Sequence, residues 1–182
     1  MAICHLNTNL TKDLSCGYNL QSVTKIYLAK ASGAKYVLEA EDEDGHVKLS
    51  GVTLGEGSEW LEIDPAKGTA SFSDTLNVTD SGSRYRSHTL SFSVVGIYGD
   101  DLHKAVDGLS LGSYIALAVF ASGDAVLLGT PSAGLEANSV TNTGSGSATE
   151  ASGISVEMSR DLTNSAYPID ARMLDTILGK NA

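Results

Sequence analysis

Apolar and polar residues alternate along most of this chain, with the period of two that is typical of half-buried β-strands. Short runs rich in glycine, serine, asparagine and aspartate separate the alternating segments, and such runs are typical of tight turns. The segments predicted as strands are residues 22–30, 35–40, 46–54, 58–64, 69–79, 83–96, 114–121, 125–128 and 153–159. The pattern therefore predicts a mainly-β domain of roughly eight to ten strands.

One segment in the middle of the chain shows helical spacing of its apolar residues instead. This segment, residues 100–111, lies between two predicted strands. Asp100 or Asp101 can cap the start of a helix there, and Gly108 and Gly112 can end it. We therefore expect one short helix embedded among strands.

The C-terminal end of the chain predicts a second helix. Its apolar side chains over residues 170–180 share one helical face, and Gly179 follows them as a stop signal. The expected organisation is an N-terminal arm over residues 1–21, a β domain over residues 22–168 and a C-terminal helix over residues 169–182.

Two predicted hairpins are long, and one connection is of low complexity. Residues 69–96 alternate on both sides of a short tip, and residues 35–54 turn through an acidic run. Residues 138–147 consist mainly of threonine, asparagine, glycine and serine, which predicts an exposed loop.

The charge of the chain restricts the kinds of partner that it can bind. Its 182 residues carry a formal net charge of −10, and such a surface repels the phosphates of nucleic acids. No apolar stretch approaches the roughly 20 residues that span a bilayer, and the N-terminal residues lack the features of a secretory signal. We therefore expect a cytoplasmic protein, in which Cys4 and Cys16 are more typical of free thiols than of a disulfide.

Motifs that carry catalytic or metal-binding chemistry are incomplete in this sequence. The acidic run before Gly45 does not have EF-hand spacing, because Gly51 stands where the loop needs its final glutamate. Two Ser-x-x-Lys sequences, which begin at Ser22 and Ser32, lack the partner motifs of penicillin-recognising enzymes. The four histidines have no cysteine or histidine at zinc spacing. We therefore expect no enzymatic activity, no cofactor and no bound metal.

Two blocks of the sequence carry a resemblance to a known family. The first block is DLSCGYNLQSVTKIYLAK (residues 13–30), in which a Cys-Gly arm leads into a Lys-Ile-Tyr-Leu strand. The second is YIALAVFASGDAVLLGTPSAGLEANS, which is followed by TGSGSATEASGISVEMS. Together these blocks resemble the tail tube proteins of bacteriophages from the Bacteroidetes lineage.

The resemblance implies both a fold and a function. The implied fold is a β-sandwich or barrel of two packed antiparallel sheets, flanked by one helix. Subunits of the family form hexameric rings that stack into a hollow tail tube, and one sheet of each subunit lines the channel. The implied partners are other copies of the chain and the terminator, baseplate and tape-measure proteins of the tail, with no membrane. The implied location is the virion, after assembly in the host cytoplasm.

On this hypothesis the acidic charge would repel DNA in the channel, and the long hairpins would make contacts between rings. Viral DNA passes through the tube without specific binding, and an acidic lumen repels its phosphates, which are spaced at about one per 1.7 Å of axis. A solvated outer face is the alternative place for the carboxylates. Contacts between rings are expected at the arm over residues 2–18 and at the two hairpin tips. The alternative is that these segments are ordinary surface loops. The tip residues are Glu41, Asp42, Glu43, Asp44, Asp80, Ser81 and Gly82.

A second hypothesis is a carbohydrate- or partner-binding β-sandwich module, such as a virion decoration protein or an adhesin. The strands and the single tryptophan, Trp60, are consistent with such a module. It would present exposed aromatic side chains, whereas a tube protein would assemble into rings as its concentration rises.

Overall fold

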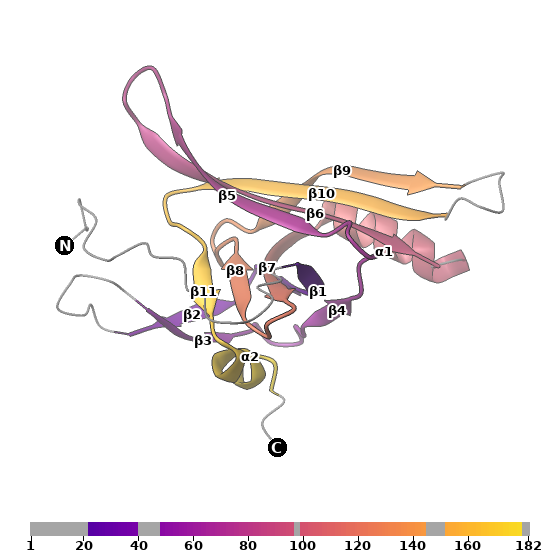
Figure 1. Ribbon diagram of the computed structural model, residues 1–182, viewed down its shortest axis with the longest axis horizontal. Coiled ribbons are helices and arrows are strands. Elements are labelled where there is room, and N and C mark those ends of the chain that lie inside the picture. The colour runs from indigo at the N-terminus through magenta and orange to yellow at the C-terminus, as the bar shows by residue number, and fades with distance from the viewer. Residues whose placement is uncertain (1–21, 40–47, 97–98, 145–151, 180–182) are drawn as a thin grey trace, which may run out of the picture.

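The computed structural model describes residues 22–39, 48–96, 99–144 and 152–179. These residues form two layers of antiparallel strands, one further hairpin and two helices (Figure 1). The prediction of a mainly-β fold with two sheet layers and two helices is therefore confirmed. Within the described residues, however, the sheets do not close into a barrel.

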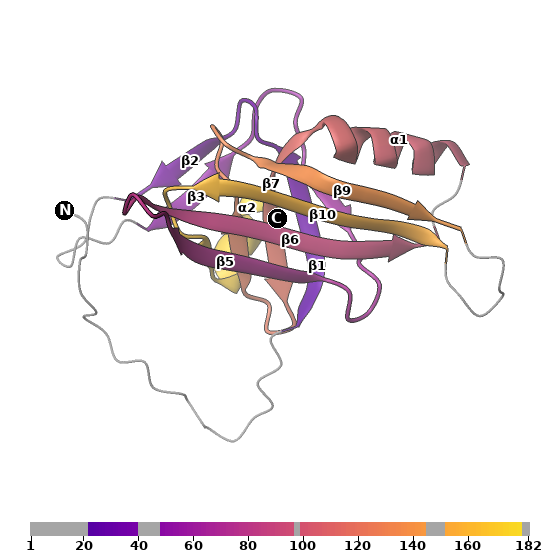
Figure 2. The same cartoon turned by 90° about the horizontal axis from the view of Figure 1, so that it is seen from above.

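The first layer contains the long strands of the molecule. It consists of β5 (Ser71–Val78), β6 (Arg84–Val95), β10 (Gly153–Leu162) and β9 (Leu135–Thr143), side by side in that order. Every neighbouring pair in this layer is antiparallel. Figure 2 looks down on the outer face of the layer, with β5 along one side and β9 along the other.

The second layer lies beneath the first (Figure 1). Its order is β4 (Leu61–Ile63), β1 (Val23–Lys30), β7 (Ser113–Phe120), β8 (Ala125–Leu128) and β11 (Tyr167–Ile169). The sequence pattern does not predict β11, because three residues that include a proline are too short to show a period.

A hairpin and a helix cover the side of the second layer that faces away from the first. The hairpin pairs β2 (Lys35–Leu38) with β3 (Leu49–Thr53), and the helix is α2 (Ala171–Ile177). The Asp170 side chain caps α2 by accepting a hydrogen bond of 2.8 Å from the Met173 amide. The second layer is consequently buried on both of its faces.

Helix α1 (Gly99–Leu111) runs beside β9, as Figure 2 shows. Asp100 and Asp101 lie in its first turn, where negative charge is favourable. The helix continues through Gly108, and Gly112 follows its last residue, so the prediction that Gly108 ends the helix was wrong. Neither helix in the described parts of the chain has the length and apolar character that crossing a bilayer requires.

Three clusters of apolar side chains hold the layers, the β2–β3 hairpin and α2 together. The cluster between the two sheets includes Leu90 and Met158 of the first layer and Ile26 and Leu128 of the second. Apolar side chains of α1 pack against its edge. The two other clusters lie on the far side of the second layer, one against α2 and one against the β2–β3 hairpin. Alternation along β6 and β10 explains the first cluster, since every second residue points toward it.

The two layers are joined at a corner between β7 and β9. Ser113 and Tyr114, at the start of β7, pair with Glu136 and Leu135 of β9 before β7 continues into the second layer. The backbone approaches closely there. A Cβ atom on Gly134 would lie 2.6 Å from the Cβ of Ala31 and 2.6 Å from the Oγ of Ser113. Glycine is therefore required at this position by the space available.

The expectation of a loop over residues 138–147 was wrong for most of its described part. Residues up to Thr143 belong to β9, which pairs with β10 from Glu136↔Ser159 to Thr143↔Gly153. The polar composition concealed the strand, because only Leu135 and Val140 mark its inward face. A strand with one solvated face needs few apolar residues when a paired neighbour supplies its backbone hydrogen bonds.

Replacing Gly134 with alanine is expected to destabilise the protein. The added Cβ would force Ala31 and Ser113 apart at the corner, at a cost of about 1–3 kcal/mol. Urea unfolding measures the loss. Gly144→Ala is the matched control, because nothing lies within 4 Å of a Cβ built there. Equal stabilities of the two variants would contradict this account of the corner.

Candidate subunit interface

The outer face of the first layer is polar along most of its four strands, with Val95 at the end of β6 as an exposed apolar residue. Strand alternation places there the residues that do not point into the core. Most of them are hydroxyl side chains: Ser71, Ser73, Thr75, Ser87, Thr89, Ser91, Ser93, Ser139, Thr141, Thr143, Ser155 and Ser159. Short hydroxyl side chains therefore cover most of this face of the sheet.

Hydrogen bonds between strands order part of this face. The hydroxyls of Ser93 and Ser155 lie 2.9 Å apart, and the Asn138 amide donates to the Ser159 hydroxyl at 2.7 Å. At the other end of the sheet, Ser87 donates to the Asp161 carboxylate. A shallow hollow of about 230 Å³ lies over the middle of the face. The face is thus fixed in shape but still exposes polar groups to solvent.

The charge on this face is acidic. Alternation assigns Glu157 and Asp161 to it, and Glu136 lies beside Ser159 at its border. Arg160 reaches Glu136 at 2.9 Å from the other side of β10. No lysine or arginine of these four strands has its own position on the outer face within the described ranges. A polyanion that met this face would be repelled.

Both sides of the first layer end in strand edges that no described residue pairs along most of their length. β5 pairs only with β6 in the described structure. β9 pairs with β10 on one side, and on the other side with β7 at Leu135 and Glu136 alone. Neither strand contains lysine, arginine or proline, the residues that commonly protect open edges from association. Both edges are therefore suited to pairing with another chain.

The β5–β6 hairpin extends well beyond the body of the molecule (Figure 1). Its tip contains three of the residues predicted for subunit contacts, Asp80, Ser81 and Gly82, and all three are exposed. The tip is an ordered turn, in which the Gly82 amide donates to Thr79 O at 2.8 Å and Thr79 N to Ser83 O at 2.9 Å. The other predicted residues, Glu41, Asp42, Glu43 and Asp44, lie outside the described residues.

The underside of this hairpin is apolar although it is exposed. Leu76 and Val78 face the same side as Phe72, but they lie beyond the body that covers Phe72. Their side chains are 53% and 59% exposed. Exposed apolar residues grouped on a projecting element are typical of a contact surface.

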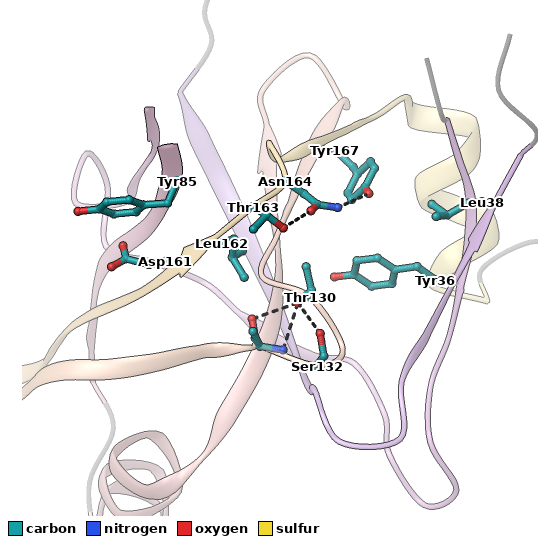
Figure 3. A pocket seen from close by; sticks show the side chains of 11 residues that line it. Tyr36, Leu38, Tyr85, Thr130, Ser132, Asp161, Leu162, Thr163, Asn164 and Tyr167 are labelled. Atoms are coloured by element: carbon teal, nitrogen blue, oxygen red, sulfur yellow. Dashed lines mark hydrogen bonds between the residues drawn. The ribbon is translucent and has the colours of Figure 1, made fainter. Parts of the chain in front are cut away.

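A pocket of about 470 Å³ opens between the bases of the two hairpins (Figure 3). Tyr36 and Leu38 of β2 line one side, and Tyr85 of β6 with Asp161 of β10 lines the other. Many of its polar atoms are already bonded within the protein: the Tyr36 hydroxyl donates to Gly129 O at 3.1 Å, and the Asn164 amide to the Tyr167 hydroxyl at 3.2 Å. The pocket is open and only partly available for polar recognition.

A buried polar cluster fixes the base of the projecting hairpin to the rest of the molecule. His88 of β6 is 1% exposed. Its Nδ1 accepts a hydrogen bond of 3.2 Å from the Gly129 amide, and its Nε2 donates to Asn164 O at 3.1 Å. The Gly129 contact requires Nδ1 to be unprotonated, so the imidazole is neutral. Burial, the largest cause, lowers the pKa of His88 below its ordinary value.

Asp74 of β5 completes this cluster. Its carboxylate accepts hydrogen bonds of 2.6 Å from Arg86 Nε and 2.9 Å from the Ala166 amide, and lies 3.6 Å from His88 Nε2. Burial acts to raise the pKa of Asp74, but these partners outweigh it and hold that pKa below its ordinary value. The cluster therefore joins β5 and β6 to the segment that precedes β11.

Trp60 does not offer a free aromatic platform. It packs beside Tyr36, Val52 and Leu54 under the second layer, and its indole Nε1 is buried without a hydrogen-bond partner. Within the described parts of the chain, no group of three His, Cys, Asp or Glu side chains gathers as a metal site. These observations place the distinctive surface of the molecule on the first layer and its hairpin.

Sequence reasoning predicted the hairpin tip but missed the hydroxyl face and the two open edges. A signal was present in the sequence, since hydroxyl residues recur at a spacing of two in β5, β6 and β9. Comparisons with known proteins add no relative: no family model, curated protein or solved structure matches the chain.

The buried cluster makes stability depend on pH. His88 has a lowered pKa in the folded protein, so the unfolded chain binds its proton more readily, and stability falls as the pH decreases below about 6.5. Asp74 contributes a further loss only below its ordinary value of 3.8. Unfolding free energies between pH 7 and pH 4.5, roughly the range in which a histidine of lowered pKa titrates, should therefore decline in the native protein.

The matched variants are His88→Gln and the exposed His103→Gln. The decline should be smaller in His88→Gln than in His103→Gln, because His88 is buried and His103 is exposed. NMR titration of the His88 imidazole in the native protein gives a second measurement that does not depend on a variant that folds. A His88 pKa at or above the ordinary histidine value of 6.5 would contradict this assignment.

Proposed function

We propose that this protein is a structural subunit of a phage tail tube, in which its copies form hexameric rings that stack around a channel for the genome. The proposal rests on the resemblance of two sequence blocks and on one structural observation. That observation is a four-stranded sheet with a polar, acidic outer face, on each side of which the edge strand is unpaired by any described residue along most of its length.

The directions of the edge strands suit a closed ring. β5 and β9 run in opposite directions, because three antiparallel steps separate them. When the β5 edge of one copy meets the β9 edge of the next, the new pair is also antiparallel. Repetition around an axis then gives one continuous antiparallel barrel, which removes every open edge of this layer.

The outer face of the first layer is the proposed lining of the channel. Short hydroxyls bind water and offer no cation to phosphates, and Glu157 and Asp161 repel them. A duplex would therefore stay near the axis and move with little friction. The core of each subunit and helix α2 would lie on the outside of the tube.

The projecting β5–β6 hairpin supports a role in contacts between copies. Its apolar underside is unnecessary for the fold of one subunit, since Leu76 and Val78 are exposed there. Asp80, Ser81 and Gly82 would lie at the far end of this contact. The terminator, baseplate and tape-measure proteins are the further partners that a tail tube requires, and the virion is the corresponding location.

The alternative, a carbohydrate- or partner-binding module, has one observation in its favour. The pocket between the hairpins combines Tyr36, Tyr85 and Tyr167 with polar side chains, as many saccharide sites do (Figure 3). A stable monomer that binds glycans would favour this function. The internal bonding of Tyr36 and Asn164 makes it the weaker candidate.

Assembly of the purified protein tests the proposal. We expect rings or tubes with sixfold symmetry in negative-stain images as the concentration rises, and a sedimentation profile that depends on concentration. A protein that remains monomeric at every concentration would contradict the proposed function. So would a reconstructed ring in which the channel is lined by basic side chains.

A change of charge in the channel tests the proposed lining. Glu157→Lys introduces a ring of cations, so assembled tubes should retain duplex DNA in a manner that weakens with salt, whereas native tubes should not. Glu59→Lys carries the same change of charge at an exposed position away from the first layer. If both variants retain DNA equally, the first layer does not line the channel.

A further inference from the structure

The β5 edge of one copy can pair with the β9 edge of another in one register that fits the strand lengths and the sides to which their side chains point. We propose that this pairing is the contact between adjacent copies of this chain. In this contact Ser71, Ser73 and Thr75 of one copy lie opposite Thr143, Thr141 and Ser139 of the next. The inference rests on the proposed ring, and it adds the register of the interface and the side chains that stabilise it.

The lengths of the free edges determine how far the strands can overlap. β5 offers Ser71–Val78, and β9 offers the residues after Glu136, because β7 occupies that edge at Leu135 and Glu136. Full overlap of the two antiparallel edges brings Ser71 to the end of β9 at Thr143. It also brings Val78 to the corner, where Ser113 of β7 pairs with Glu136.

In this register the outward side chains of β5 lie opposite outward side chains of β9. A register displaced by one residue would break this match. Ser71, Ser73 and Thr75 point outward, as do Thr143, Thr141 and Ser139. A slip of one residue would place Leu76 of one copy on the polar face of the next. In the proposed register the three outward pairs over residues 139–143, beyond the bulge at Asn138, each consist of two hydroxyl residues, and such cross-strand pairs are favourable.

The apolar underside of the hairpin gains a partner in the same register. Leu111, the last residue of α1, is 88% exposed and stands two positions before Ser113. α1 packs against the inner side of the first layer, the side to which Leu76 and Val78 also point. Val78 of one copy therefore meets Leu111 of the next beside the corner. Burying these side chains removes apolar area from water that the single subunit leaves exposed.

Charges around this apolar contact are complementary. Arg84 lies opposite Val78 at the end of the arm. α1 carries Asp100, Asp101 and Asp107 against a single lysine. Asp107 stands one helical turn before Leu111, so both share a face of the helix. The Asp107 carboxylate is exposed to solvent, although its Oδ2 lies 3.5 Å from His103 Nδ1. Contact between Val78 and Leu111 brings Arg84 toward this acidic side of α1.

Disulfide trapping between two variants tests the register. The native cysteines, Cys4 and Cys16, are first replaced by serine in the full chain. Ser73→Cys is then mixed with Thr141→Cys. Each copy carries a single cysteine, so a disulfide can form only between two copies. We expect covalent dimers in this mixture. We expect about tenfold fewer with Ser87→Cys in place of Ser73→Cys, since Ser87 lies inside the sheet, and a disulfide needs Cα atoms within about 7 Å.

The position of the apolar contact is tested by a second pair of variants. Leu111→Ser should raise the concentration needed for assembly about tenfold, because a leucine is no longer buried between copies. Leu61→Ser is the matched control, since Leu61 is 52% exposed on β4, far from both edges in the strand order. Circular dichroism checks that each variant remains folded.

The outcomes separate this inference from the proposed function. Rings without the Ser73–Thr141 disulfide would overturn the register and leave the tail-tube proposal standing. Disulfide-linked dimers without rings or tubes would support the register and overturn that proposal. Equal effects of Leu111→Ser and Leu61→Ser on assembly would overturn the contact between Leu111 and the hairpin.

Discussion

The structure depends on the corner where β7 leaves the first layer and enters the second. β7 pairs with β9 at Ser113 and Tyr114 and then with β8 and β1 over the rest of its length. A strand that belongs to two layers fixes the distance between them, and Gly134 is required because the backbones meet there without room for a side chain. The same corner ends the free edge of β9 and positions the last residue of α1. This corner therefore determines both the packing of the core and the extent of the open β9 edge.

The buried cluster around His88 fixes the position of the projecting hairpin relative to the rest of the molecule. A hairpin that leaves the body of a protein needs a rigid base, because two strands alone are only marginally stable in water. Asp74 binds Arg86 across the hairpin and the Ala166 amide beyond it, while His88 binds Gly129 after β8. Each partner comes from a different part of the chain. The base of the arm is thus fixed by hydrogen bonds to several segments of the chain.

The sequence allowed most of the strands and both helices to be predicted, because alternation and helical spacing report burial directly. Two kinds of feature could not be found in this way. β9 has a polar composition, and its identity as a strand depends on pairing with β10, a relation that no local pattern contains. The cluster of Asp74, His88 and Arg86 joins residues of one hairpin to Asn164 and Gly129, and nothing in their spacing indicates it. The hydroxyl face was present in the sequence as a period of two, but hydroxyls alone do not distinguish a solvated face from an interface.

The lack of lysine, arginine and proline along β5 and β9 is the main reason to regard the described structure as one part of an assembly. A monomeric β-protein commonly places lysine, proline or a bulge on an open edge, because an unprotected edge pairs with other chains. β9 has a bulge at Asn138, opposite Glu157 and Met158 of β10, but residues 139–143 beyond it pair regularly with β10. β5 has neither a bulge nor a charged residue on its outward face. Selection for a soluble monomer would act against such edges, whereas selection for a closed ring would maintain them. The exposed Leu76, Val78 and Leu111 fit the same reasoning, since each lies beside an edge that the ring would close.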